Sequence, residues 1–152
     1  MKSGSKIPSL LAGVAGEYFV AAELSRRGYI ASISLRNTRG IDILATNQNA
    51  LRTITIQCKT NQLGLKVWML DEKSEKFHAE NHYYVFVALG SPSQRPGYHI
   101  VPSAKVAEFV ADNHKKWLST PGSKGQPHLD TPMRKFIDPD DKFLERWDIL
   151  GL

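Results

Sequence analysis

The chain has 152 residues, of which 41% are hydrophobic, and this suits one compact domain with a hydrophobic core. Its 20 lysines and arginines against 15 aspartates and glutamates permit a polyanionic partner, although charge alone is weak evidence for one. A single cysteine, Cys58, excludes an internal disulfide, and no Cys/His cluster has zinc spacing, so we expect a reducing cytoplasm and no structural zinc. The apolar run 10–22 contains glycines and Glu17, which argues against a signal peptide or a membrane span.

The N-terminal part predicts a disordered leader followed by a helix. Residues 1–8 are polar and form the expected leader. Ser9 then suits a helix cap, and Gly28 suits the left-handed position that ends a helix spanning 10–27. Glu17 lies one turn from small residues on either side, so another element could approach it closely. Most apolar residues of this helix follow helical spacing: Leu10, Leu11, Val14, Ala15, Tyr18, Phe19, Ala22 and Leu24.

Three strands are predicted next, over residues 29–35, 41–45 and 51–59, and the asparagine-rich segment 46–50 suits a hairpin turn. Consecutive strands joined by short turns predict an antiparallel meander. Residues 67–69 are a candidate edge strand, and Asp71 begins a short helix whose acidic residues lie at the favoured end.

The second half of the chain begins with its most apolar run, residues 82–89, which predicts a buried central strand. A strand over 98–101 and a helix over 103–118 follow. Residues 120–131 are expected to form a loop, and the amphipathic ending 140–150 a helix that packs on the core. We therefore expect a domain over 9–118, with 119–152 as a loop and C-terminal helix packed on it, in an α/β (α+β) fold with a mixed sheet.

Two of the predicted strands carry polar residues that suit chemistry. Asp42 lies between two isoleucines, and such a charge is costly to bury unless it is paired or binds a metal. Gln57 and Lys59 lie two residues apart in the next strand, so their side chains point to one face while Cys58 points to the other. We expect Asp42, Gln57 and Lys59 to converge.

The segments GVAGEYFVAAEL, RRGY, GIDILA and IQCKT resemble the PD-(D/E)xK, or restriction-endonuclease-like, nuclease superfamily. Their order is most similar to archaeal Holliday-junction resolvases, and the matching motifs span about residues 10–60. The resemblance implies an αβββαβ core with a central mixed sheet flanked by helices. It assigns the helix glutamate to Glu17, the strand aspartate to Asp42, the acid of the acid-x-lysine pair to Gln57 and its lysine to Lys59.

The same resemblance implies a DNA nuclease that uses Mg²⁺ or Mn²⁺. Asp42 and Gln57, helped by Glu17 and the backbone carbonyl of Cys58, would hold the metal, and Lys59 would position the attacking water. Gln57 departs from the pattern, because an amide oxygen can ligate a hard cation but lacks the charge of a carboxylate. Because one small domain has one site, cutting both strands of a duplex would call for a homodimer.

Each feature also has a structural interpretation. Asp42 could pair with Arg36 or Arg39, and Lys59 could simply extend into solvent. The same fold with a decayed metal site could serve as a nucleic-acid or protein interaction module, and an unrelated metabolic domain is a third alternative. Two further groups of residues have two interpretations each. Lys66, Lys73 and Lys76 could line a phosphate channel or form a solvated face. Trp147, Ile149 and Leu150 could form a dimer interface or belong to the core.

Overall fold

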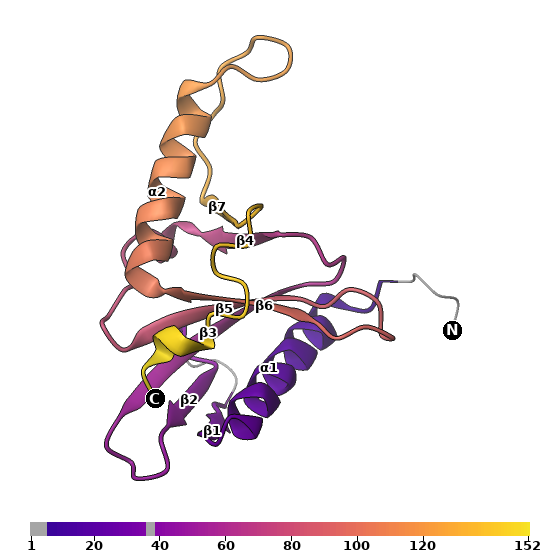
Figure 1. Cartoon of the computed structure of the whole chain (residues 1–152). Helices are drawn as coiled ribbons and strands as arrows, with labels where there is room; N and C mark the ends of the chain where they lie inside the picture. Colours follow the sequence, from indigo (N-terminus) through magenta and orange to yellow (C-terminus); the bar gives the residue numbers. More distant parts are fainter. Residues whose placement is uncertain (1–5, 36–38) are drawn as a thin grey trace.

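The structure is a computed structural model that describes residues 6–35 and 39–152. A five-stranded mixed sheet in the order β1-β2-β3-β5-β6 forms its centre, with helix α1 on one face and helix α2 on the other (Figure 1). This arrangement confirms the predicted mixed sheet flanked by helices. The sheet strands are β1 (Ile30–Ile33), β2 (Ile43–Thr46), β3 (Thr53–Asn61), β5 (His82–Ala88) and β6 (Gly97–Pro102).

Helix α1 (Ser9–Arg26) confirms the predicted element but not its cap. Pro8 occupies the N-cap position and makes no side-chain hydrogen bond, so the expected Ser9 cap is wrong. Gly28 has a φ of 87° and donates its N–H to the carbonyl of Ser25 at 2.9 Å, as predicted for a left-handed helix end. Before the helix, Ile7 exchanges two backbone hydrogen bonds with the Gln62 side chain, while the rest of the expected leader, residues 1–5, lies outside the described residues.

The face of α1 that packs on the sheet is made mainly of small residues. Of the apolar residues that follow helical spacing, Leu10, Leu11, Tyr18 and Phe19 are exposed. The close approach occurs at Gly16, where an added Cβ would lie 2.0 Å from the Thr60 hydroxyl oxygen and 3.1 Å from its Cβ. The helix therefore sits against β3 at a distance that only glycine permits, on the side buried by Ala12, Gly16, Val20, Glu23 and Leu24.

Two glycines of α1 give opposite predictions for stability. We expect Gly16→Ala to destabilise the fold by about 1–3 kcal/mol, because the methyl group overlaps Thr60 in a packed contact. A Cβ at Gly13 would meet nothing within 4 Å, so Gly13→Ala should stabilise the helix by about 0.5–1 kcal/mol. Urea denaturation of both variants measures the difference, and equal effects would contradict this packing. The double variant Gly16→Ala/Thr60→Ala, which removes the overlapping hydroxyl oxygen, should recover part of the loss.

The meander is antiparallel as predicted, with Ile43 paired to Ile56 and Ala45 to Ile54. β2 begins at Ile43, so Asp42 lies just outside the strand and not within it. β5 runs parallel to β3 at the centre of the sheet and is buried along nearly its whole length. The crossover between these two strands contains β4 (Val67–Asp71) and a 3₁₀ helix, η1 (Glu72–Glu75), which replaces the predicted short helix.

A second, two-stranded sheet lies with α2 (Ser103–Ser119) against the face of the main sheet opposite α1. It pairs β4 with β7 (Met133–Ile137), a strand that the sequence did not predict. The expected C-terminal helix over 140–150 is also wrong, because only the 3₁₀ turn η2 (Trp147–Leu150) forms there. Trp147 and Leu150 are nonetheless buried against α1 and the sheet, so they belong to the core and not to an interface.

The segment after β7 returns to cover the free edge of β6. Ile100 donates its N–H to the carbonyl of Phe143 at 3.0 Å, and Glu145 donates to the carbonyl of Tyr98 at 2.8 Å. This pairing protects an edge strand that would otherwise expose unpaired backbone groups. None of the helices within 6–35 and 39–152 has the length and apolar character needed to cross a bilayer.

Candidate functional site

Asp42 lies at the point where β2 separates from β3. Its N–H donates to the carbonyl of Ile56 at 2.8 Å, although Ile56 is also the partner of Ile43. Two residues thus face one, as in a β-bulge, which redirects a side chain at a strand end. On the other side, Ser34 donates its N–H to the carbonyl of Asp42 at 2.8 Å, so the backbone at Asp42 is fixed by both neighbouring strands.

The carboxylate of Asp42 takes the place of a backbone hydrogen-bond acceptor beside β3, where β2 no longer pairs with it. Its Oδ2 accepts the N–H of Cys58 at 2.7 Å. Burial raises the pKa of Asp42, and the Cys58 N–H and the positive charge of Lys59 offset this only in part. The half-buried carboxylate is therefore held in place by one hydrogen bond, with its negative charge incompletely compensated.

Gln57 and Lys59 point to the face of β3 that is opposite α1. Gln57 is the register partner of Tyr84 in β5, and Lys59 is the partner of Phe86, both of which belong to the cluster under α2. A Cβ at Gly40, whose φ is +62°, would lie 3.7 Å from the Gln57 amide oxygen. The amide oxygen is therefore directed toward the segment that carries Asp42.

Cys58 contributes its backbone to this arrangement and its thiol to the core. Its N–H points to Asp42, and the carbonyl of a strand residue points to the same edge as its N–H, so the Cys58 carbonyl also lies at the Asp42 edge. The thiol packs against the cluster under α1, and burial together with the charges of Asp42 and Glu17 raises its pKa well above the usual range. The sulfur is a neutral thiol, so any ligand from this residue is the carbonyl.

Glu17 approaches from the other side of β3. It follows Gly16, whose contact with Thr60 places this turn of α1 over the face to which Cys58 and Thr60 point. Its charge raises the pKa of the Cys58 thiol, which places its carboxylate near the same strand. The structure thus brings the Asp42 carboxylate and the Cys58 backbone together at one edge of β3, with Gln57 and Lys59 on one face of that strand and Glu17 on the side of the other face.

Of the two arginines that could pair with Asp42, the structure describes Arg39, and it forms no ion pair with Asp42. Arg39 is exposed, Arg36 lies outside the described residues, and no described residue forms an ion pair with Asp42. Within the same described part of the chain, no group of three or more histidine, cysteine, aspartate or glutamate side chains is arranged to hold a metal ion. Lys66, Lys73 and Lys76 are all exposed, and Lys66 forms an ion pair with Asp141 at 2.5 Å.

Tyr84 is a further residue of this region, and the sequence left it between stacking on bases and a place in the core. Its side chain is 1% exposed, and burial together with the charges of Asp71 and Asp42 raises its pKa to about 12. It lies beside Gln57 only because β5 runs parallel to β3 in this register. The sequence signal was merely an aromatic residue in a buried strand, which is ordinarily core.

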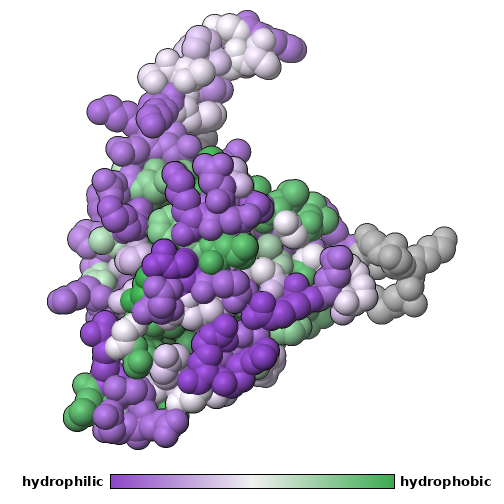
Figure 2. Space-filling view, in the orientation of Figure 1, coloured by the Kyte–Doolittle hydropathy of each residue, from purple (hydrophilic) through white to green (hydrophobic). Residues whose placement is uncertain are grey.

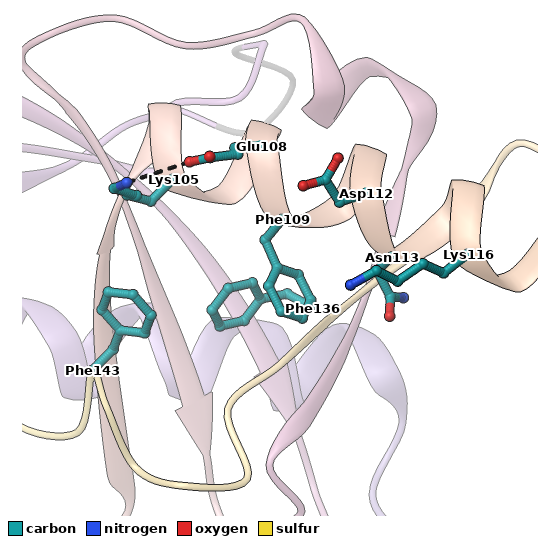
Figure 3. A pocket seen from close by; sticks show the side chains of 8 residues that line it. All are labelled: Lys105, Glu108, Phe109, Asp112, Asn113, Lys116, Phe136 and Phe143. Carbon is teal, nitrogen blue, oxygen red and sulfur yellow. Dashed lines mark hydrogen bonds and ion pairs between the residues drawn. The ribbon is translucent and has the colours of Figure 1, made fainter.

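Two surface hollows lie elsewhere. One, of about 260 Å³, runs along α2, where Phe109 and Phe136 point toward each other and Lys105 pairs with Glu108 at 3.3 Å (Figure 3). The other, of about 430 Å³, lies between the end of α2 and β7. Neither is lined by Glu17, Asp42, Gln57 or Lys59.

Comparison with known proteins gives a match in structure but none in sequence. Neither the protein-family models nor the curated proteins that were compared match the chain. Among solved structures, the chain is similar to Hjc from Archaeoglobus fulgidus, a Holliday junction resolvase from an archaeal hyperthermophile. The TM-score is 0.53 at 13% identity, and the match covers 91% of this chain and 95% of the resolvase. The chain therefore has a resolvase-like, restriction-endonuclease-like fold.

Proposed function

We propose that this protein is a nuclease that hydrolyses phosphodiester bonds in DNA with Mg²⁺ or Mn²⁺. The observation that carries the proposal is the Asp42 carboxylate, which is fixed on the N–H of the residue between Gln57 and Lys59. A fold similar to that of a DNA resolvase supports the same substrate class, although a fold alone does not establish an activity.

The donor atoms at this edge fit a hard cation. Asp42 and Gln57 supply a carboxylate and an amide oxygen, and the Cys58 carbonyl faces the same edge. Mg²⁺ and Mn²⁺ prefer such oxygen ligands, and Mg²⁺ commonly uses only one or two carboxylates together with water and phosphate oxygens. The incompletely compensated charge of Asp42 favours a cation nearby, and Glu17 adds negative charge from the α1 side.

The remaining chemistry follows from where the side chains lie. A bound divalent cation neutralises charge on the phosphate and makes a water molecule more acidic. Lys59 extends from the same strand face as Gln57, where its amine can orient the attacking water and offset the charge that develops on phosphorus. The Cys58 N–H keeps Asp42 oriented, so this carboxylate need not reorganise as the reaction proceeds.

The proposal is tested by incubating the purified protein with labelled duplex DNA and with a four-way DNA junction, each with Mg²⁺, with Mn²⁺ and with EDTA. We expect cleavage that requires the metal and is lost in Lys59→Met. Cleavage that persists in EDTA, or the absence of any cleavage of either substrate, would contradict the proposal.

A homodimer fits this function, because each protein copy has one candidate site, and one site can cut only one DNA strand at a time. Several exposed apolar side chains lie on α1 and on the edge strand β1, where Leu10 is 67% exposed, Tyr18 64% and Ile30 54%. Exposed apolar surface of this kind marks a protein interface. We propose that two copies associate through α1 and β1.

Gln57→Glu should strengthen metal binding. The change adds a carboxylate where the structure has an amide oxygen directed toward Asp42, so we expect the affinity for Mg²⁺ to rise by about ten-fold or more, since a second anionic ligand acts at short range. Isothermal titration with Mg²⁺ measures this effect, and Gln48→Glu, an exposed glutamine in the β2–β3 turn, is the matched control. Equal affinity in the two variants would argue against a metal beside Gln57.

The second candidate is a binding module with the same fold and no catalysis. It is favoured by Gln57 and by the small number of acidic side chains that the described residues gather at the edge. Titration separates the two candidates. Salt-sensitive DNA binding with no Mg²⁺ or Mn²⁺ binding would support the module, and binding of neither would support a protein partner.

A further inference from the structure

Most of the net positive charge of the chain lies in one segment. Residues 113–137, here called the basic arm, contain five lysines and arginines and a single acidic residue, Asp130. The other 127 residues contain 15 basic and 14 acidic residues and are therefore almost neutral. The basic arm comprises the end of α2, the following loop and β7. The end of α2 and the loop project from the body of the protein, with a surface coloured from white to purple, whereas β7 lies beside β4 (Figures 1 and 2).

The loop of the basic arm is fastened to α2 by two histidines. The ring of His128 stacks on Trp117 with centroids 4.2 Å apart, and its Nδ1 donates to the Trp117 carbonyl at 2.7 Å. His114 donates from Nε2 to the carboxylate of Asp130 at 2.7 Å. The only acidic residue of the basic arm is thus engaged by a histidine, and it does not pair with a lysine.

The lysines of the basic arm are available to a partner. Lys115, Lys116, Lys124 and Lys135 are all exposed, and none of them forms an ion pair with a described residue. Lys116 and Lys135 border the cleft of about 430 Å³ between α2 and β7. Arg134 differs, because it is buried and paired with Glu75, so it anchors the arm and does not face a partner.

The ion pair between Arg134 and Glu75 also connects the basic arm to the candidate site. Glu75 lies in η1, and two residues later Phe77 approaches Gly40, where an added Cβ would lie 3.1 Å from the Phe77 ring and 3.7 Å from the Gln57 amide oxygen. Gln57, Lys59 and α2 also lie on the same face of the main sheet. A long ligand at Gln57 and Lys59 can therefore continue toward the basic arm on that face.

We propose that the basic arm is a second DNA-binding surface, whose lysines contact backbone phosphates of the DNA that flanks the candidate site. The inference rests on the proposed function for its choice of DNA. Charge complementarity favours this partner, because unpaired lysines on separate elements match a ligand with regularly spaced negative charges. Phosphate contacts position a nucleic acid without reading its sequence, so the basic arm should bind without sequence preference.

The test compares two variants that each remove two positive charges. Lys116→Gln/Lys135→Gln alters the basic arm, and Lys105→Gln/Lys142→Gln removes exposed lysines outside it. Binding of the full chain to a labelled duplex of about 30 base pairs is measured in EDTA between about 50 and 200 mM salt, where phosphate contacts dominate the salt dependence. We expect the arm variant to lower the slope of log K against log salt by about 1.8 and to weaken binding several-fold, with little change in the control.

The outcomes separate this inference from the proposed function. Equal salt slopes in the two variants, or no DNA binding by the wild type, would overturn the second surface. Loss of binding to phosphatidylserine vesicles, with DNA binding unchanged, would also overturn it and indicate a membrane surface. Binding that depends on the basic arm without metal-dependent cleavage would support this inference and contradict the nuclease, whereas cleavage with equal slopes would do the reverse.

Discussion

Asp42→Asn should lower the rate of metal-dependent DNA cleavage by about 10³-fold or more and leave the fold intact. The asparagine carbonyl oxygen can still accept the N–H of Cys58, so the strand edge keeps its shape. The variant loses the carboxylate that the Cys58 N–H holds there, and a loss of roughly 4 kcal/mol of transition-state stabilisation corresponds to that factor. Single-turnover cleavage with saturating protein measures the change.

The stability of Asp42→Asn should move in the opposite direction to its activity. Burial raises the pKa of Asp42 above that of the unfolded chain, so the ionised carboxylate costs stability at neutral pH, and a neutral amide removes this cost. We expect a thermal midpoint at or above that of the wild type. Glu80→Gln, at an exposed acidic residue, should change neither property. An inactive variant that is also unfolded would leave the carboxylate without a demonstrated catalytic role, and an active one would contradict the proposal.

Asp138→Ala should destabilise the protein by about 2–4 kcal/mol. The carboxylate is 2% exposed and accepts hydrogen bonds from His99 Nδ1 at 2.7 Å, from the Lys142 N–H at 2.9 Å and from the Phe143 N–H at 3.0 Å. These bonds shape the turn that carries the chain from β7 to the edge of β6. Urea denaturation measures the loss, and Asp140→Ala, at an exposed neighbour, is the control.

The contribution of Asp138 should also depend on pH. Burial alone would raise its pKa, but the hydrogen bonds from His99, Phe143 and Lys142 lower it overall. Because the pKa is lower in the folded than in the unfolded chain, the stabilisation is complete above the unfolded value of about 3.9. It is lost as the pH falls from there through the lower folded value. The difference between wild type and Asp138→Asn should therefore shrink below about pH 4, and a constant difference would contradict the assignment.

The sequence predicts the order of most elements because their patterns are local. The meander, the buried β5 and both long helices follow from alternation, helical spacing and glycine at Gly28. Local patterns do not predict β7, because one of its inward positions holds Arg134. This arginine is buried through its pairing with Glu75, which lies 59 residues away in the sequence. The alternation of apolar and polar residues is thereby lost. A charge that a distant partner neutralises cannot be recognised as buried from its neighbours.

Helical spacing alone does not select the buried face of α1 either. Apolar residues surround the helix, and the face that contains Gly16 packs on the sheet because this glycine allows contact with Thr60. Glu23 is also buried there, paired with Arg27 and with Arg95 from the β5–β6 loop. At the candidate site, spacing predicts that Gln57 and Lys59 share a face. It cannot predict the bulge that places Asp42 against the Cys58 N–H, because this depends on where two strands separate.

The central claim is that Asp42, Gln57 and the Cys58 carbonyl share one divalent cation. The most direct measurement is a crystal structure of the wild-type protein soaked in Mn²⁺, with data recorded at the manganese absorption edge. We predict an anomalous peak at the strand edge, at roughly 2.1 Å from an Asp42 carboxylate oxygen and from the Gln57 amide oxygen. The absence of a peak there, in crystals that retain the Asp42–Cys58 hydrogen bond and contain Mn²⁺ at high concentration, would contradict the claim.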